Sequence, residues 1–313
     1  MDYRTLCLAT GGTGFRLAKR DPAAHNSFAG RSDAQPEIDA QLKRMGDLQE
    51  KLYAEKKRSL LIVLQGIDAA GKDGVCWHVL KGMGPQGCHV TAFKVPSDEE
   101  KAHDFLWRVH PHTPALGNVA VFNRSHYEDV LVARVHALVP ETVWRRRYEV
   151  INDFERSLHL AGTTVLKFFL HISKEEQLKR FGARLEDPDR QWKISASDYS
   201  ERARWDDYIA AYDDMIANCS TPHAPWYVIP SNHKWFRDLA ISQIIANTMD
   251  DMDMQPPQPS VDVAEIRKLY EAELAKAAKE DGDTDADAKG NGNGDGKGDG
   301  SKEGKSRKGE KAD

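Results

Sequence analysis

The chain has 313 residues, of which 30% are charged and 40% hydrophobic, and its mean hydropathy is -0.63. This length is typical of one large domain or two small ones. The longest unbroken aliphatic run, Leu60 to Leu64, is much shorter than the roughly 20 apolar residues that a membrane-spanning helix needs. No basic segment followed by an apolar stretch opens the sequence, so we expect neither an export signal nor a membrane partner.

Charge and cysteine usage exclude further classes of protein. The net charge of -5 argues against a nucleic-acid-binding protein, which usually carries a basic excess. The four cysteines lie far apart and form no Cys-x-x-Cys pair, so the sequence predicts neither a disulfide framework nor a zinc site. A protein of the reducing cytoplasm fits this composition best.

Residues 281–313 form a low-complexity end to the sequence. They contain no Val, Ile, Leu, Met, Phe, Trp, Tyr or Cys, and they carry nine acidic and seven basic side chains. A segment with nothing to bury cannot offset the entropy lost on ordering, so we expect a disordered tail. Such a tail acts as a tether or aids solubility, and a specific partner motif is the alternative.

The rest of the chain alternates helix and strand patterns. We predict an amino-terminal arm over residues 1–35, one domain over 36–252 and a short helical extension over 253–280. Within the domain, hydrophobic periodicity and short apolar runs predict the elements in chain order. They are helix 37–57, strand 59–65, helix 72–83, strand 89–95, helix 98–110, strand 118–122, a helix to 135, helix 141–161, strand 163–172, helix 174–185, helix 198–217, strand 226–229 and helix 234–252.

Strands that alternate with helices predict an α/β fold, in which a parallel sheet is flanked by helices on both faces. In such sheets, ligands bind beyond the carboxyl ends of the strands. We therefore expect the chemistry just after residues 65, 95, 122, 172 and 230.

The first of these positions contains a phosphate-binding loop. Residues 66–73 read Gly-Ile-Asp-Ala-Ala-Gly-Lys-Asp, which fits the pattern Gly-x-x-x-x-Gly-Lys between a strand and a helix. Glycines let main-chain N–H groups turn towards a phosphate, and the helix that follows presents its positive dipole end. Lys72 is predicted to contact the transferred phosphoryl group. The loop residues predicted to bind phosphate are Gly66, Ala69, Ala70 and Gly71.

The acidic residues of the loop depart from the usual pattern. Asp73 replaces the Ser or Thr whose hydroxyl normally holds Mg²⁺, and it is counted here among the phosphate-binding residues. A carboxylate inside a phosphate cradle repels the anion unless a cation lies between them, so Asp68 is predicted to contact a metal ion or its waters. The alternative is that Asp68 hydrogen-bonds its own turn.

Polar residues also follow the third strand of the domain. Residues 123–129 read Asn-Arg-Ser-His-Tyr-Glu-Asp. P-loop proteins place a metal-holding acid at or near the end of a neighbouring strand, and because Asn123 stands there the acid must be Glu128 or Asp129, one helical turn further on. The planar guanidinium of Arg124 matches phosphate oxygens, and Asn123 is counted among the residues that bind phosphate or nucleotide. Together with the loop, these residues predict an active site.

These motifs resemble the polyphosphate kinase 2 family. The likeness extends over about residues 36–252 and is carried by residues 66–73, 122–131 and 168–177, by Arg184-Leu-Glu-Asp-Pro and by Trp192-Lys-Ile-Ser. It implies a thymidylate-kinase-like P-loop kinase fold with a helical lid at about 179–197. It also implies reversible, Mg²⁺-dependent transfer of the terminal phosphate between inorganic polyphosphate and a nucleotide, with Mn²⁺ as a substitute ion, and assembly as a homodimer or homotetramer.

The resemblance also implies roles for single residues. Residues 123–129 look like those of the branch that acts on nucleoside mono- and diphosphates, that is AMP and ADP, with GMP and GDP as further acceptors. Other members have an acid directly after the strand and a Trp in place of His126, which leaves the second metal ligand open. Asp68 and Asp129 are assigned to the metal, with Glu128 as the alternative, and Arg124 to the developing charge.

The family's lid maps onto a basic helix and the polar break 186–197. Arg180 and Arg184 are four residues apart, so on a helix they share a face. With Lys193, they are expected to clamp phosphates when the lid closes and excludes water. The alternative is a solvated basic face. Residues 145–147, all arginines, are expected on the exposed side of a helix, with a polyanion track as the alternative.

Two other functions fit the same motifs. One is an ATP-dependent nucleotide kinase of this fold, against which the acid-bearing loop without a hydroxyl after Lys72 argues. The other is a non-catalytic nucleotide-binding module whose tail recruits a partner. Lys72, Asp68 and the arginines together argue against it.

Overall fold

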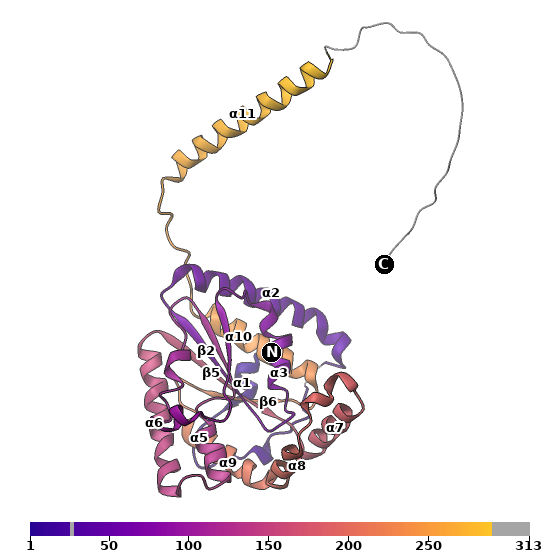
Figure 1. The fold of residues 1–313 in the computed structure, drawn as a ribbon, viewed down its shortest axis with the longest axis vertical. Coiled ribbons are helices and arrows are strands. Elements are labelled where there is room, and N and C mark those ends of the chain that lie inside the picture. The colour runs from indigo at the N-terminus through magenta and orange to yellow at the C-terminus, as the bar shows by residue number, and fades with distance from the viewer. Residues whose placement is uncertain (26–27, 290–313) are drawn as a thin grey trace, which may run out of the picture. The chain divides into compact units, whose positions relative to one another are not determined.

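The computed structural model describes residues 1–25 and 28–289, and Figure 1 shows its course. Six strands form one sheet in the order β1-β6-β5-β2-β4-β3. The strands are β1 (Leu8–Ala9), β2 (Ser59–Gln65), β3 (Cys88–Ala92), β4 (Val119–Asn123), β5 (Thr163–His171) and β6 (Trp226–Pro230). Neighbours among β2 to β6 pair in parallel, whereas β1 pairs antiparallel with β6. The predicted parallel sheet is confirmed, with a short antiparallel strand added at one edge.

Helices connect the strands and cover the sheet. The α-helices are α1 (Tyr3–Cys7), α2 (Arg31–Glu55), α3 (Lys72–His78), α4 (Asp98–Lys101), α5 (Glu128–Val135), α6 (Glu141–Leu160), α7 (Lys174–Leu185), α8 (Ala196–Ala203), α9 (Trp205–Cys219), α10 (Lys234–Asp250) and α11 (Val263–Lys289). Short 3₁₀ turns are η1 (Leu17–Lys19), η2 (Leu80–Gly82), η3 (His110–His112) and η4 (Pro188–Lys193).

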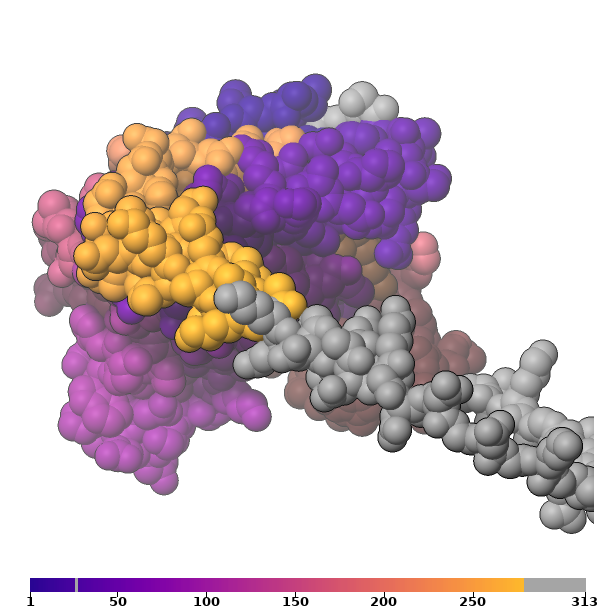
Figure 2. Space-filling model, turned by 90° about the horizontal axis from the view of Figure 1, so that it is seen from above, coloured from indigo at the N-terminus to yellow at the C-terminus, as the bar shows by residue number. Residues whose placement is uncertain are grey.

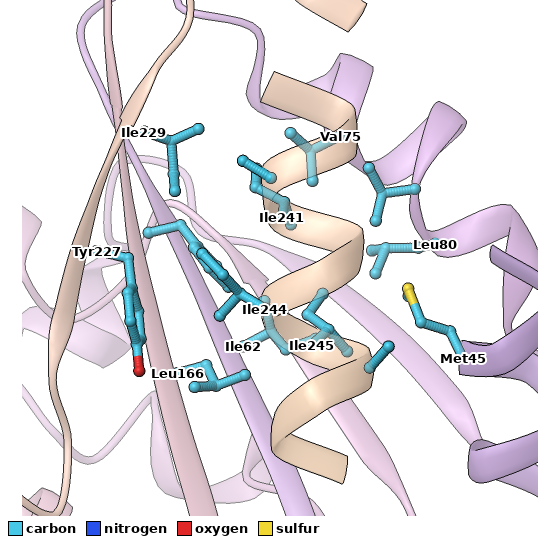
Figure 3. Close-up of a cluster of buried hydrophobic side chains, with 14 of the residues drawn as sticks. Met45, Ile62, Val75, Leu80, Leu166, Tyr227, Ile229, Ile241, Ile244 and Ile245 are labelled. Atoms are coloured by element: carbon cyan, nitrogen blue, oxygen red, sulfur yellow. The ribbon is translucent and has the colours of Figure 1, made fainter. Parts of the chain in front are cut away.

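Two apolar cores lie on opposite faces of the sheet, because side chains alternate along each strand. On one face, Ile62 and Leu166 point towards α10, and Figure 3 shows α10 packed between these strands and the side chains of Met45, Val75 and Leu80. On the other face, the strands pack against α5, α6 and α9. The central strands are buried on both faces, which is why β2 reads as a continuous apolar run.

The register brings the carboxyl ends of the parallel strands to one edge of the sheet. Leu64 near the end of β2 pairs with Asn123, the last residue of β4, and with Phe168 of β5. Ala92, the last residue of β3, pairs with the same Asn123. The loops after β2, β4, β5 and β6 therefore share this edge, as the sequence predicts.

The amino-terminal residues differ most from their prediction. Instead of a separate arm over 1–35, the described residues of this segment form α1, β1, η1 and the start of α2. The ring of Tyr3 packs edge-on against Phe236 of α10, at 5.4 Å between centroids. Figure 2 shows the indigo amino-terminal residues beside orange residues of α10. Short apolar pieces without a sustained period were not recognisable as part of the core.

Several helices are shorter or more broken than predicted. The helix expected over 72–83 ends at His78 and gives way to η2, and the helix expected over 98–110 ends at Lys101. There the carboxylate of Asp104 accepts a hydrogen bond from the main-chain N–H of Leu106, which stabilises a turn instead. The helix expected over 198–217 is split into α8 and α9 at Arg204.

Residues 258–289 belong to a second unit, which contains α11. This helix includes residues 281–289, which we expected to be disordered; it begins in an Ala-, Glu- and Lys-rich stretch whose helix propensity is high. The rest of the expected tail, residues 290–313, lies outside the described residues. None of the helices in the described part of the chain is both long and apolar enough to cross a bilayer.

Candidate active site

The loop between β2 and α3 is shaped by backbone conformations that few residues adopt. Gly71, which precedes the first residue of α3, has φ +109°, and Ala69 has φ +64°. A Cβ atom at position 71 would lie 2.1 Å from Nη1 of Arg237, so glycine is required there both by φ and by space. The main-chain N–H of Ala70 bonds to the carbonyl of Ile67 at 3.0 Å, which tightens the turn.

Lys72, the first residue of α3, directly follows this loop and is 8% exposed. Its Nζ donates a hydrogen bond of 2.6 Å to the carbonyl of Gly66, the first residue of the loop. Burial and the nearby charge of Arg124 lower the pKa of Lys72 to about 8, although the carboxylates of Asp68 and Glu128 oppose this shift. The ammonium is thus held against the first carbonyl of the loop.

Two buried arginines hold the loop through its carbonyl groups. Nη1 of Arg180 donates to the carbonyls of Ala69 and Ala70, both at 2.9 Å. Its Nη2 donates to the carbonyl of Ser231, at 2.5 Å. Arg237 of α10, which is 1% exposed, donates to the carbonyl of Gly71 at 3.4 Å. The loop is therefore fixed to α7 and α10.

These contacts correct one assignment. Arg180 was expected to clamp phosphates from the lid, but its guanidinium is buried and bonded to main-chain carbonyls and to the carboxylate of Glu176, at 2.8 Å from Nε. Spacing placed Arg180 and Arg184 on one face without showing which of them points into the body. Arg237 and Gln177, which donates to the carbonyl of Asp68 at 3.0 Å, were not singled out from sequence. Gln177 falls in the motif 168–177, whereas nothing marked Arg237.

A row of alternating charges runs from the loop to the end of β4. Nη2 of Arg124 lies 2.7 Å from a carboxylate oxygen of Asp68, and Nη1 lies 3.6 Å from one of Glu128. Burial raises the pKa of Asp68, but the charges of Lys72 and Arg124 outweigh it, so the net pKa is lowered and the carboxylate is ionised at neutral pH. Asp68 thus bonds a side chain from another strand end rather than its own turn.

A glutamine that sequence reasoning missed joins the two strand ends. Gln65, the last residue of β2, is fully buried, and its Nε2 donates to Oγ of Ser125 at 3.2 Å and to Oε1 of Glu128 at 3.1 Å. Gln65 directly follows the apolar run Leu60 to Leu64, and this polar end of the strand was the available signal. The contact fixes Glu128 next to the phosphate loop.

Asp129 points elsewhere. Its carboxylate lies 3.2 Å from Nη1 of Arg147, which also donates to the main-chain carbonyl of Asp129 at 2.8 Å. Burial raises the pKa of Asp129 to about 6, against the opposing charges of Arg147 and Arg108. Arg147 was expected on the exposed side of its helix, but the structure turns it towards this carboxylate. Asp68 and Glu128 thus share Arg124, whereas Asp129 is paired with Arg147.

The remaining predicted residues lie at the open side of the loop. Nδ2 of Asn123 donates to Asp73 at 2.9 Å, and Nζ of Lys193 in η4 lies 3.4 Å from the other oxygen of Asp73. Arg184 lies 3.8 Å from a carboxylate oxygen of Asp198. The contacts of Lys193 and Arg184 are long, partly exposed ion pairs of low energy. Lys193 and Arg184 are therefore available for other anions.

The donor set suits a hard divalent cation that is shared with phosphate. No group of three or more His, Cys, Asp or Glu residues is arranged around a common point in the part of the chain that the structure describes. Asp68 and Glu128 nevertheless offer carboxylate oxygens on both sides of a cation, the guanidinium of Arg124. Mg²⁺ is usually held by one or two carboxylates together with waters and substrate phosphates. The residues present fit such an ion.

Comparison with known proteins shows which family the chain belongs to. Residues 29–257 match the family model for polyphosphate kinase 2. An AMP/ADP-polyphosphate phosphotransferase of Meiothermus ruber is 48% identical over 246 residues, which are 78% of this chain and 92% of the relative. An ADP-polyphosphate phosphotransferase of Rhodopseudomonas palustris is 46% identical over 230 residues, covering 70% of this chain and 80% of the relative.

A solved structure supports the fold assignment. The crystal structure of polyphosphate kinase 2 from Arthrobacter aurescens TC1 has a TM-score of 0.83 and 44% sequence identity, and the match covers 86% of this chain and 96% of that chain. The predicted P-loop kinase fold is confirmed.

The phosphate loop yields a test that compares two glycines. Gly71→Ala forces a Cβ against Arg237 and an unfavourable φ, so we expect a loss of at least about 1 kcal/mol of unfolding free energy and a loss of phosphate binding. Gly182→Ala, in α7 with open space around its Cβ, should instead stabilise by about 0.5–1 kcal/mol. Urea denaturation and titration with inorganic pyrophosphate measure both. Unchanged stability and binding in Gly71→Ala would contradict this account of the loop.

Proposed function

The chain belongs to the polyphosphate kinase 2 family, and we propose on this basis that it transfers the terminal phosphate of inorganic polyphosphate to a nucleoside mono- or diphosphate. The observation that carries the proposal is the row Asp68, Arg124 and Glu128 beside the buried Lys72. Its relative of 48% identity is named for AMP and ADP, which makes these the first acceptors, with GMP and GDP as further ones.

The proposed chemistry needs positioning and charge rather than a covalent intermediate. The terminal phosphate oxygen of the nucleotide forms a bond to the last phosphorus of the polyphosphate, and the bridging oxygen leaves with the shortened chain. No general base is needed, because the attacking oxygen is already anionic. Lys72, Arg124 and the loop N–H groups stabilise the charge on the phosphoryl group in flight. Asp68 and Glu128 would hold a divalent ion, which neutralises phosphate charge when it is bound.

Other parts of the proposal concern the setting of the reaction. We assign Mg²⁺ as the ion, with Mn²⁺ as a substitute, and closure of residues 179–197 over the phosphates with Arg184 and Lys193 as the clamping cations. We also assign a cytoplasmic location, which the four free cysteines suit, and a homodimer or homotetramer.

The direct test mixes the purified protein with polyphosphate, Mg²⁺ and AMP or ADP, with no nucleoside triphosphate added. We expect ADP from AMP and ATP from ADP, and initial rates with AMP, ADP, GMP and GDP rank the acceptors. Lys72→Ala should lower kcat at least about 100-fold while the protein stays folded. Product that requires added ATP as donor would favour the nucleotide kinase, and tight nucleotide binding without transfer would favour the non-catalytic module.

The second metal ligand can be identified with two neighbouring substitutions. We propose Glu128 rather than Asp129, because Glu128 shares Arg124 with Asp68 and Asp129 is paired with Arg147. Glu128→Gln should raise the Mg²⁺ concentration for half-maximal rate by about tenfold or more, since an amide is a weaker ligand for this ion. Asp129→Asn should raise it less than about threefold. The reverse order of effects would return the role to Asp129.

The lowered pKa of Lys72 predicts a pH dependence. A bound polyanion favours the ammonium form, so its pKa rises from about 8 on binding and the protein takes up protons near pH 8.5. At pH 6.5 Lys72 is already charged and uptake by this group should vanish. Affinity for polyphosphate should therefore fall as pH rises through 8. Calorimetric titrations of long-chain polyphosphate in two buffers of different ionisation enthalpy measure the uptake.

The control for this experiment is Lys72→Arg, whose guanidinium stays charged at both pH values. Its proton uptake at pH 8.5 should be smaller than that of the wild type. Equal uptake in the two proteins would show that groups other than Lys72 take up the protons.

A further inference from the structure

A charged pair is buried in the core that faces α5, α6 and α9. Nζ of Lys167, in the middle of β5, lies 2.5 Å from Oε2 of Glu155 in α6, and both side chains are fully buried. Lys167 also donates to the carbonyl of Cys219 at 2.7 Å, and its Nζ lies 5.3 Å from the ring centroid of Trp226. The pair therefore ties a strand, two helices and the surrounding apolar side chains together.

The hydroxyl of Tyr127 completes this pair. It donates to Oε1 of Glu155 at 2.7 Å and accepts from Nζ of Lys167 at 2.8 Å, and the side chain is fully buried. The ring of His126 lies next to it, with Nε2 at 3.4 Å from the same oxygen of Glu155. Two consecutive side chains of the loop after β4 are thus directed into the buried pair.

Stability alone is a weak reason for such a pair. Taking two charges out of water costs several kcal/mol per ion, and well-packed hydrophobic residues of similar volume are often equally or more stabilising. The pair also orients the side chain of Tyr127, because its hydrogen-bonding groups accept the Tyr127 hydroxyl at only one position. That fixes the residue which directly precedes Glu128 and follows Arg124 by three.

The same loop is held from its other side by β2. The main-chain N–H of Arg124, whose φ is +62°, donates to the carbonyl of Leu64 at 3.1 Å. Oγ of Ser125 accepts from Gln65 and from the main-chain N–H of Tyr127, at 3.1 Å for the latter. These contacts set the start of the loop, whereas Tyr127 sets its end, where α5 begins.

We propose that Tyr127, anchored by the buried pair Lys167–Glu155, is a positioning residue that sets the reach of Arg124 and Glu128 towards the reacting phosphates. The inference rests on the proposed phosphate transfer. Tyr127 touches no substrate in this account and acts through the two charged residues beside it. Since these interact with charge that develops during transfer, loss of the anchor should lower kcat more than it raises the KM for polyphosphate.

The test compares Tyr127→Phe with Ser59→Ala. Each removes one buried hydroxyl; Ser59 bonds Thr163 at 2.9 Å at the opposite, amino-terminal ends of β2 and β5. Both variants should lose thermal stability. Only Tyr127→Phe should lower kcat, by roughly tenfold to hundredfold, with KM for polyphosphate changed less than about threefold. A kcat equal to that of the wild type, or lowered as much in Ser59→Ala, would overturn the proposal.

If Tyr127→Phe does not fold, a second variant tests the same proposal. In the double variant Glu155→Met, Lys167→Met, two flexible apolar side chains of similar length replace both charges, and the Tyr127 hydroxyl loses its anchor. We expect the same fall in kcat. A folded double variant with unchanged kcat would overturn the proposal. Failure of the wild type to transfer phosphate at all would instead overturn the proposed function.

Discussion

The active site depends on the way the carbonyl oxygens of the phosphate loop are neutralised. A loop that turns its N–H groups towards an anion turns some of its carbonyls the other way, into the protein. Here Arg180 and Arg237 meet the carbonyls of Ala69, Ala70 and Gly71. Because these arginines are buried and come from α7 and α10, the loop keeps its shape before any phosphate is bound. Preorganised donors of this kind need no rearrangement during the reaction.

The same requirement explains two features of the sequence around the loop. Gly71 has φ +109°, a conformation that L side chains rarely adopt, and Arg237 lies where a Cβ would be placed. Gln177 donates a hydrogen bond to the main-chain carbonyl of Asp68, so a third residue from a neighbouring helix holds the loop backbone. The carboxylate of Asp68 instead accepts a hydrogen bond from Arg124. Side chains of α7 and α10 thus fix the conformation of the phosphate loop, although the loop belongs to neither helix.

Sequence alone was sufficient for the parallel strands of the sheet and for the edge that bears the site, because β2 and β5 contain apolar runs and motifs follow their ends. It did not show the short antiparallel strand β1. The sequence was insufficient to show which way individual side chains point. Glu128 and Asp129 are consecutive on a helix and so point about 100° apart. The choice between them depends on Arg147, 18 residues further on. Likewise, Glu155 sits four residues after the buried Ile151, a detectable sign of burial, but its partner Lys167 lies on another element.

The cationic residues near the loop differ in the strength of their contacts within the protein, and this difference indicates which of them can bind a substrate. Arg180 and Arg237 are buried and donate to main-chain carbonyls. Moving Arg180 would remove the hydrogen bonds that it donates to Ala69 and Ala70, at a cost of about 1–3 kcal/mol for each buried carbonyl left unpaired, whereas the carbonyl of Gly71 also accepts from the main-chain N–H of Val75 at 3.0 Å. Arg184 and Lys193 have contacts of 3.8 and 3.4 Å at partly exposed carboxylates, which cost little to break. A polyanion can therefore attract the second pair without disturbing the first. Arg180 and Arg237 therefore hold the conformation of the phosphate loop, and Arg184 and Lys193 can move to bind the phosphates of a substrate.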